Sequence, residues 1–173
     1  GDMQAAHVDG ARNVAEAAAE AGLSSLVQIS AIGADAQSDS AYGATKSKGE
    51  AAVRAAFPQA TIIRPSIIFG RDDAFTNRFA TLVTSAPIVP LIRAEAKFQP
   101  VHVGDVAKAV AAAVADAGTF GGQTYELGGP DTFSMGEIFK WIGTETGRAP
   151  TFVAVPDCAA ALMAKLTGWA PGA

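Results

Sequence analysis

The sequence predicts an α/β fold in which helices cover a parallel, doubly wound sheet. Short apolar runs of strand type alternate along the chain with longer segments whose apolar residues recur at helical spacing. Neighbouring strands can run parallel only if the chain crosses back between them, and a helix is the usual crossover. Because such crossovers are right-handed, they place the helices over the faces of the sheet.

Glycine and proline punctuate the first half of the chain. Gly22 suits the position just after a helix, Pro58 stops a helix, and Pro65 closes a short apolar run. The expected elements are a helix over Asp9–Ala21, a strand over Leu23–Ile29, a helix over Ala41–Phe57, a strand over Thr61–Arg64 and a turn after Ile67–Gly70.

The second half continues the alternation. Ser134 and Glu137 form a capping-box pattern that opens a helix reaching Thr146, and Asp105 is expected to cap a helix. The other expected elements are helices over Ala74–Ser85, Val106–Ala115 and from Asp157 onward, with extended segments over Lys97–Val103, Gln123–Leu127 and Phe152–Val155. The apolar runs that end at Ile29, Arg64 and Leu127 should share one sheet.

Composition excludes several classes of protein. The 173 residues are 49% hydrophobic and 17% charged, so the chain can bury a core. A net charge of −4 argues against a nucleic-acid surface. Cys158 is the only cysteine, and the two histidines lack ligand spacing, so we expect no disulfide and no metal. No apolar run is long enough to span a bilayer, so the expected compartment is cytoplasmic and any membrane association peripheral.

Several single residues have simple structural explanations. His7 is expected to be solvated on a polar helix, Arg64 to form an ion pair, and His102 to point away from its valine neighbours or to be a satisfied core residue. An apolar stripe on the Ser134 helix is expected in the core: Ile138, Phe139 and Trp141.

One motif carries chemistry, the run Tyr42-Gly43-Ala44-Thr45-Lys46. Residues four apart share a helix face. An ammonium beside a phenol favours the phenolate and lowers a pKa that is ordinarily about 10, and it can also bind a ribose hydroxyl. Tyr42 and Lys46 therefore suit hydride-transfer chemistry. The alternative is an exposed amphipathic helix with a packed tyrosine and a solvated lysine.

The sequence on either side makes the Tyr42–Lys46 motif more specific. The phrases S-A-I-G-A-D from Ser30, Y-G-A-T-K-S-K-G-E from Tyr42, R-P-S-I-I-F-G from Arg64 and K-F-Q-P-V-H-V-G-D-V-A from Lys97 occur in this order. Together they resemble the extended and atypical short-chain dehydrogenase/reductases. The resemblance is closest to the group related to the NAD(P)H-binding accessory subunit of respiratory complex I and its bacterial homologues, and it covers nearly the whole chain.

The resemblance implies a Rossmann-like fold, NADP or NAD as cofactor, and a role for each matching residue. Tyr42 would be the catalytic or vestigial phenol, Lys46 would hold the nicotinamide ribose, and Ser30 would be a second catalytic and cofactor-binding candidate. The remaining residues implied to line the nicotinamide side are Ala31, Pro65, Ser66, Ile67 and Ile68.

Two departures from the family pattern matter. Members with activity usually carry a hydroxyl where this chain has Ala31, and Ser30 points to the opposite face of an extended segment. The chain also lacks a G-x-G-x-x-G turn, the pyrophosphate cradle that opens the fold. We therefore expect a partial NAD(P)-binding domain over residues 1–173, intermixed with a smaller substrate-side region over about 71–173.

The expected loss of the first strands has a physical consequence. The Leu23–Ile29 strand would lack its inner neighbour, and an unpaired apolar edge promotes association. These residues alone are therefore expected neither to form a stable monomer nor to bind a dinucleotide.

The leading functional hypothesis is a nucleotide-binding structural or regulatory subunit, favoured by Ala31. Its implied partners are complex I or another protein subunit, and its implied location is peripheral on the inner membrane or the mitochondrial matrix side. The alternative, favoured by Tyr42 and Lys46, is an oxidoreductase or epimerase acting on a nucleotide-sugar or a lipid-like carbonyl. A third hypothesis is a redox-sensing regulator that binds NADP and a protein partner.

Overall fold

A computed structural model describes residues 2–156, which divide into two compact units. The first unit comprises residues 2–66 and 103–127, and the second comprises 67–102 and 128–156. The chain therefore leaves the first unit, enters the second, and passes through each of them twice. The helix expected from Asp157, together with Cys158, lies outside the described residues.

A three-stranded parallel sheet forms the centre of the first unit. Its strands are β1 (Val27–Ile29), β2 (Thr61–Pro65) and β7 (Thr124–Leu127), in the order β1-β2-β7. β2 pairs in parallel with both neighbours. The prediction of one parallel sheet from these three apolar runs is confirmed.

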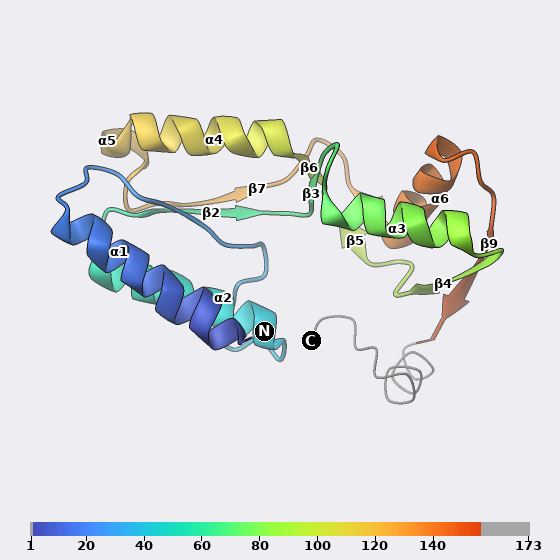
Figure 1. Ribbon diagram of the computed structural model, residues 1–173, viewed down its shortest axis with the longest axis horizontal. Helices are drawn as coiled ribbons and strands as arrows, with labels where there is room; N and C mark the ends of the chain where they lie inside the picture. Colours follow the sequence, from blue (N-terminus) through green and yellow to red (C-terminus); the bar gives the residue numbers. More distant parts are fainter. Residues whose placement is uncertain (1, 157–173) are drawn as a thin grey trace. The chain divides into compact units, whose positions relative to one another are not determined.

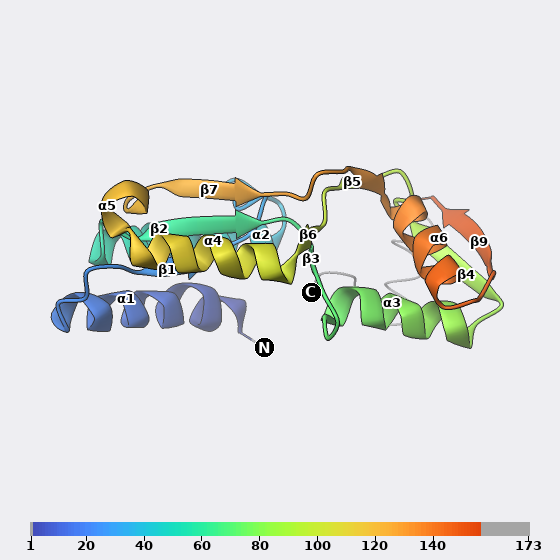
Figure 2. The same ribbon diagram turned by 90° about the horizontal axis from the view of Figure 1, so that it is seen from above.

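Helices cover both faces of this sheet (Figures 1 and 2). On one face lie a π-helical segment η1 (Ala5–Gly10), α1 (Ala11–Glu20) and α2 (Ala41–Ala56). On the other lie α4 (Val103–Ala115) and the short α5 (Ala117–Phe120). This is the doubly wound arrangement that the alternating pattern predicts.

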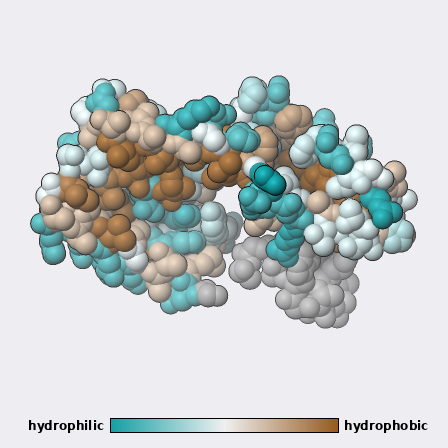
Figure 3. Space-filling view, turned by 45° about the horizontal axis from the view of Figure 1, so that its top comes forward, coloured by the Kyte–Doolittle hydropathy of each residue, from teal (hydrophilic) through white to brown (hydrophobic). Residues whose placement is uncertain are grey.

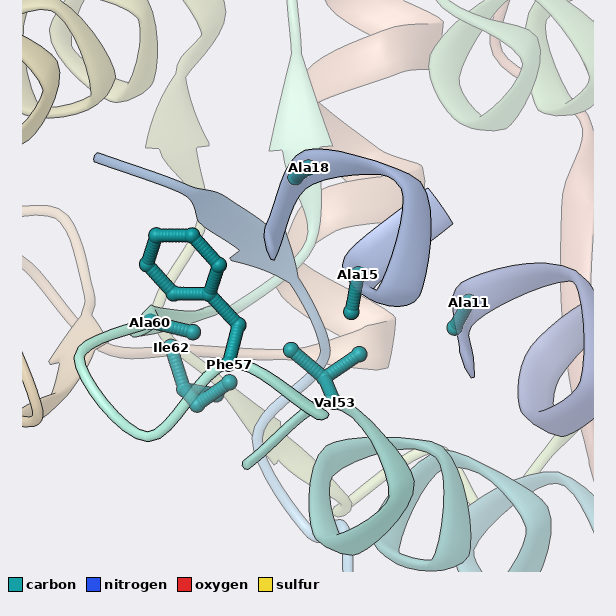
Figure 4. Close-up of a cluster of buried hydrophobic side chains, with 7 residues drawn as sticks. All are labelled: Ala11, Ala15, Ala18, Val53, Phe57, Ala60 and Ile62. Atoms are coloured by element: carbon teal, nitrogen blue, oxygen red, sulfur yellow. The ribbon is translucent and has the colours of Figure 1, made fainter. Parts of the chain in front are cut away.

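The core of the first unit lies between the sheet and the α1–α2 pair (Figure 4). Val53 of α2 points toward α1, and Phe57, the residue after α2, joins the same cluster beside Ile62, which is fully buried. Alanines complete the cluster: Ala11, Ala15, Ala18 and Ala60. Small side chains on α1 let the two helices approach closely, so the alanine-rich sequence serves packing as well as helix propensity.

The first strand is shorter than expected, because residues after α1 complete a helix cap. Gly22 has a φ of +66°, and its N–H donates to the Ala19 carbonyl. The Leu23 N–H donates to the Ala18 carbonyl, 3.0 Å away, which completes a Schellman motif. The Leu23 side chain is 54% exposed, so the strand begins only at Val27.

Two helices start earlier than the sequence suggests. Helical geometry begins before Asp9, and α4 begins at Val103 rather than Val106. Asp105 therefore lies in the first turn of α4 rather than at its N-cap, and it accepts a hydrogen bond from Lys108. A carboxylate is favoured both at an N-cap and in the first turn, so its presence does not fix the start of a helix.

The second unit contains two helices, α3 (Ala74–Ser85) and α6 (Met135–Glu145), and three two-stranded sheets. The sheets pair β3 (Ile68–Phe69) with β6 (Val101–His102), β4 (Ile88–Ile92) with β9 (Thr151–Val155), and β5 (Lys97–Phe98) with β8 (Phe133–Ser134). The first two pairs are parallel and the third is antiparallel.

The capping box is present as predicted. The Ser134 hydroxyl accepts from the Glu137 N–H, and the Glu137 carboxylate accepts from the Ser134 N–H. Ile138 and Phe139 are buried as expected, whereas Trp141 is 51% exposed, so its assignment to the core was wrong. Trp141 follows Ile138 by three positions, so it lies on the same side of the helix but at the margin of the apolar stripe.

The strand β4 was not predicted because Pro87 and Pro90 flank and interrupt it. Proline is tolerated there because, within residues 2–156, β4 pairs with another strand on one edge only. Its inward residues Val89 and Leu91 pack with α3 and α6 in the core of the second unit. The burial of alternate side chains along β4 therefore stabilises the strand although Pro90 has no N–H to donate.

One apolar surface stands out on the first unit (Figure 3). The outward side of α4 carries Val103 and Val114, which are 48% and 50% exposed, and exposed alanines lie between them. Val106 and Ala113, which lie about a quarter of a turn further round the helix, are buried against the sheet. The apolar residues of α4 therefore extend beyond the side that packs on the sheet.

Backbone contact between η1 and α2 generates a stability prediction. A Cβ added at Gly49 would lie 2.1 Å from the His7 carbonyl oxygen, whereas one at Gly136 would meet nothing closer than 3.5 Å. Gly49→Ala should lower the free energy of unfolding by about 1–3 kcal/mol through overpacking, despite a helix-propensity gain of about 1 kcal/mol.

Gly136→Ala is the matched control, because the same substitution in α6 has room for the methyl group. It should leave the free energy of unfolding unchanged or raise it by up to about 1 kcal/mol. Urea unfolding of both variants provides the measurement. Equal effects of the two substitutions would contradict a tight backbone approach at Gly49.

Candidate functional site

The site begins at the carboxyl edge of the parallel sheet. The Ser30 N–H, just beyond β1, donates to the Ile63 carbonyl at 2.7 Å, and the Ser66 N–H donates to the Leu127 carbonyl at 2.8 Å. The Ile32 N–H reaches back to the Pro65 carbonyl at 3.1 Å. These bonds hold the segments after β1 and β2 side by side. Open α/β sheets bind their ligands at this edge.

Tyr42 and Lys46 lie at this edge, on one face of α2. The Lys46 Nζ is 5.9 Å from the centre of the Tyr42 ring and donates a hydrogen bond of 3.2 Å to the Ile29 carbonyl oxygen. Tyr42 is 44% exposed. The predicted placement of this pair, on one helix face and at the carboxyl end of β1, is therefore confirmed.

The Ile29 carbonyl is available to Lys46 because β1 is an edge strand. The Leu26 carbonyl and the Ser30 N–H both bond to the β2 segment, so the backbone groups of Ile29 face away from β2. Among residues 2–156, β1 has a strand partner on one side only. The ammonium of Lys46 thus satisfies an acceptor that the sheet leaves unpaired.

Burial and charge act in opposite directions on Lys46. Removal of the ammonium from water lowers its pKa, and the nearby Glu50 carboxylate partly offsets this by raising it. Glu50 stands one helical turn further along the same face of α2. The result is an ammonium with reduced hydration, which strengthens its interaction with any polar group brought beside it.

The loop before α2 presses against Gly43. A Cβ there would lie 2.8 Å from the Ser38 hydroxyl and 3.0 Å from the Gly33 carbonyl oxygen. The Asp35 N–H donates to the Gly43 carbonyl at 3.3 Å. Glycine beside Tyr42 therefore allows the loop to pack on the first turn of α2 and to fix where that turn begins.

Ser30 and Ala31 differ in their surroundings. Ser30 is 4% exposed, and its buried hydroxyl has no hydrogen-bond partner among the described residues. Ala31 is half-buried and carries no hydroxyl. The serine is thus turned into the protein, as expected for the residue next to a site-facing position.

A buried ion pair joins α2 to the sheet. Arg64 donates to both carboxylate oxygens of Glu50, at 2.9 and 2.7 Å, and contacts Glu126 at 3.5 Å. Its hydrogen bonds to Glu50 raise the pKa of the guanidinium. The prediction that Arg64 forms an ion pair is confirmed. The pair connects α2 to β2 and β7, behind the Tyr42–Lys46 face.

His7 is part of this assembly, contrary to the expectation that it is simply solvated. Its ring packs edge-to-face with Tyr42 at a centroid distance of 5.4 Å, and Nδ1 lies 2.9 Å from the Thr45 hydroxyl. Burial lowers the pKa of His7, and the Lys46 charge lowers it further. No local pattern revealed this contact, because the two residues are 38 positions apart.

The remaining predicted site residues divide between the two units. Pro65 is buried at the end of β2, and Ser66 is half-buried beside it. Ile67 and Ile68 belong to the second unit, where the Ile67 carbonyl accepts from the Val101 N–H. His102 is exposed beside the buried Val101, and its ring packs edge-to-face with Phe69. The expected alternation ends there, because Val103 is also exposed and begins α4.

The fold and this site agree with a known family. A family model described as the RmlD substrate binding domain matches residues 2–165. The chain belongs to the RmlD substrate binding domain family.

Curated relatives of this family member support the resemblance to complex I subunits. NADH dehydrogenase [ubiquinone] 1 alpha subcomplex subunit 9 of Arabidopsis thaliana is 39% identical over 83% of the chain and 36% of its own length. Ceramide reductase of Caulobacter vibrioides is 35% identical over 86% of the chain and 46% of its length. The chain therefore spans less than half of the length of these relatives.

Solved structures agree on the fold. The dTDP-4-dehydrorhamnose reductase of Bacillus anthracis, solved in complex with NADP, has a TM-score of 0.73 at 22% identity. The match covers 98% of this chain and 68% of the reductase chain. At this level of identity the likeness establishes the shared fold.

The described residues offer neither a membrane-spanning helix nor a metal cluster. None of the helices within residues 2–156 combines the length and the apolar character needed to cross a bilayer. Within the same range, no group of three or more histidine, cysteine or acidic side chains is gathered as a metal site requires.

The buried ion pair generates a second stability prediction. Glu50→Gln should lower the free energy of unfolding by about 1–3 kcal/mol, because it removes the buried carboxylate that makes two hydrogen bonds to Arg64 and leaves only the longer contact with Glu126. Glu126→Gln should cost less than about 1 kcal/mol, because Glu126 is largely exposed and its contact is long. Denaturant unfolding of the two variants gives the comparison, and a larger loss for Glu126→Gln would contradict it.

Proposed function

We propose that this chain is the nicotinamide-side portion of an NAD(P)-binding protein of the short-chain dehydrogenase/reductase type. The observation that supports this most directly is the Tyr42–Lys46 pair at the carboxyl edge of a parallel sheet. In this proposal Lys46 holds the nicotinamide ribose, and Tyr42 lies beside the nicotinamide.

The residues at this edge fit such a cofactor. Lys46 is a partly dehydrated donor, suited to the vicinal hydroxyls of a ribose. Ala31 and Ser66 are half-buried at the ends of β1 and β2, and they offer small side chains beside Lys46 in this proposal. The nicotinamide would supply hydride chemistry. Ile67 and Ile68 belong to the second unit, and their contact with the nicotinamide stays a prediction.

We propose that the cofactor serves stability or regulation rather than turnover. Ala31 cannot donate a hydrogen bond to a developing oxyanion, and the buried Ser30 hydroxyl is turned into the protein. One missing donor of this kind costs roughly two to three orders of magnitude in rate. The complex I relatives favour the same role, as one subunit of a larger assembly on the inner membrane or, in a mitochondrion, its matrix side.

The alternative is an active oxidoreductase. Tyr42 and Lys46 keep the spacing that acid–base catalysis requires, and one relative is named a ceramide reductase. A lipid-like carbonyl is then the favoured substrate class, ahead of a nucleotide-sugar. In either case we propose that the first unit holds the cofactor and that the second unit belongs to the substrate side.

Cofactor binding is tested on the full-length protein with two lysines of α2. Lys46→Ala should weaken binding of NADH or NADPH by about tenfold, the loss of one strong hydrogen bond to a ribose hydroxyl. Lys48→Ala removes the same charge from an exposed position on the same helix and should bind as the wild type does. Fluorescence titration of the reduced nucleotide is the measurement; equal effects of both variants would exclude a site at Lys46.

Turnover is tested at Ala31. Ala31→Ser should raise any residual reductase activity by about ten- to a hundredfold, because it restores a hydroxyl donor at the strand end. Ala36→Ser adds a hydroxyl to an exposed position of the same loop and should change nothing. Activity is followed as NADPH oxidation with long-chain ketones and sugar nucleotides. Rapid turnover by the wild type would overturn the structural or regulatory role.

A further inference from the structure

His7 makes its contacts from an unusual stretch of helix. η1 spans Ala5–Gly10 with π-helical hydrogen bonding before α1 continues as an ordinary α-helix. Such single wide turns are rare and are found most often at functional sites. Here the wide turn lies against α2, where a Cβ at Gly49 would collide with the His7 carbonyl oxygen. The His7 carbonyl therefore lies close against the backbone of α2.

The hydrogen bonds of Thr45 allow an assignment of the His7 proton. The Thr45 hydroxyl has one hydrogen, which it donates to the Ala41 carbonyl at 2.7 Å. The same oxygen lies 2.9 Å from the His7 Nδ1. We therefore assign the ring proton to Nδ1, which donates to the Thr45 hydroxyl, and the lone pair to Nε2.

The Lys46 ammonium supports the neutral form of this ring. Both burial and the Lys46 charge lower the pKa of His7, which favours the neutral ring. His7 therefore combines a hydrogen bond to Thr45 with an edge-to-face contact with Tyr42.

We propose that His7 is a positioning residue of the Tyr42–Lys46 site. Its Nδ1–H holds Thr45, which lies between Tyr42 and Lys46 on the first two turns of α2, while its ring limits the rotation of the tyrosine ring. This inference rests on the proposed nucleotide-binding function. It concerns the neighbouring helix rather than the residues that the short-chain dehydrogenase/reductase motif contains.

The test uses the full-length protein and NADPH or NADH as probes. His7→Leu and Thr45→Val should each weaken binding about tenfold, and the double variant should bind no more weakly than either one, because both remove the same hydrogen bond. His7→Asn, whose amide nitrogen can replace Nδ1–H, should stay within about threefold of the wild type. Thr144→Val, which removes a comparable intrahelical bond from α6, should bind normally.

A purely structural role would give a different pattern. His7→Leu would then lower the urea midpoint without changing the dissociation constant at low urea, and His7→Asn would not restore binding. Either result overturns the proposal. It is also overturned if the fold-changes in the dissociation constant of the two single variants multiply in the double variant. A wild-type protein that binds neither nucleotide would instead overturn the proposed function. Coupling between the two variants in urea unfolding would then show separately whether His7 holds α2.

Discussion

Parallel pairing of β1 with β2 is the constraint on which the rest of the first unit depends. It sends the chain back through α2, so that the strand ends and the start of that helix meet at one edge of the sheet. The same pairing leaves the Ile29 carbonyl facing outward, where the Lys46 ammonium satisfies it. A side chain suited to ligand contact thus has a structural role as well.

Two neighbouring segments of backbone approach α2 closely. Gly43 admits the preceding loop, and Gly49 admits the carbonyl of His7. Both glycines lie on α2, within one turn on either side of Lys46. Glycine weakens an isolated helix, so their presence here indicates that packing against neighbours outweighs local propensity. The helix is stable because of what it contacts rather than because of its own sequence.

Electrostatics distinguish the two ends of the α2 face. Toward the core, Glu50 and Arg64 form a two-bond ion pair that is largely withdrawn from water. Toward the sheet edge, Lys46 is partly dehydrated and makes no direct ion pair with a carboxylate within residues 2–156, and its charge lowers the pKa of His7. A paired carboxylate and a partly dehydrated ammonium therefore lie one helical turn apart on α2.

Much of this architecture follows from the sequence alone. Apolar periodicity, Pro58, Gly22 and the Ser134 capping box each specify local structure, because their effects act within a few residues. The order of motifs also predicted the family and the placement of Tyr42 and Lys46.

Only the tertiary structure decided the rest. The contact of His7 with Thr45, the exposed position of Trp141 and the pairing of the proline-containing β4 depend on segments far apart along the chain. Local propensity carries no information about such partners. Packing supplies free energy from groups that meet only after folding, and that energy decides between conformations that the local sequence leaves nearly equal.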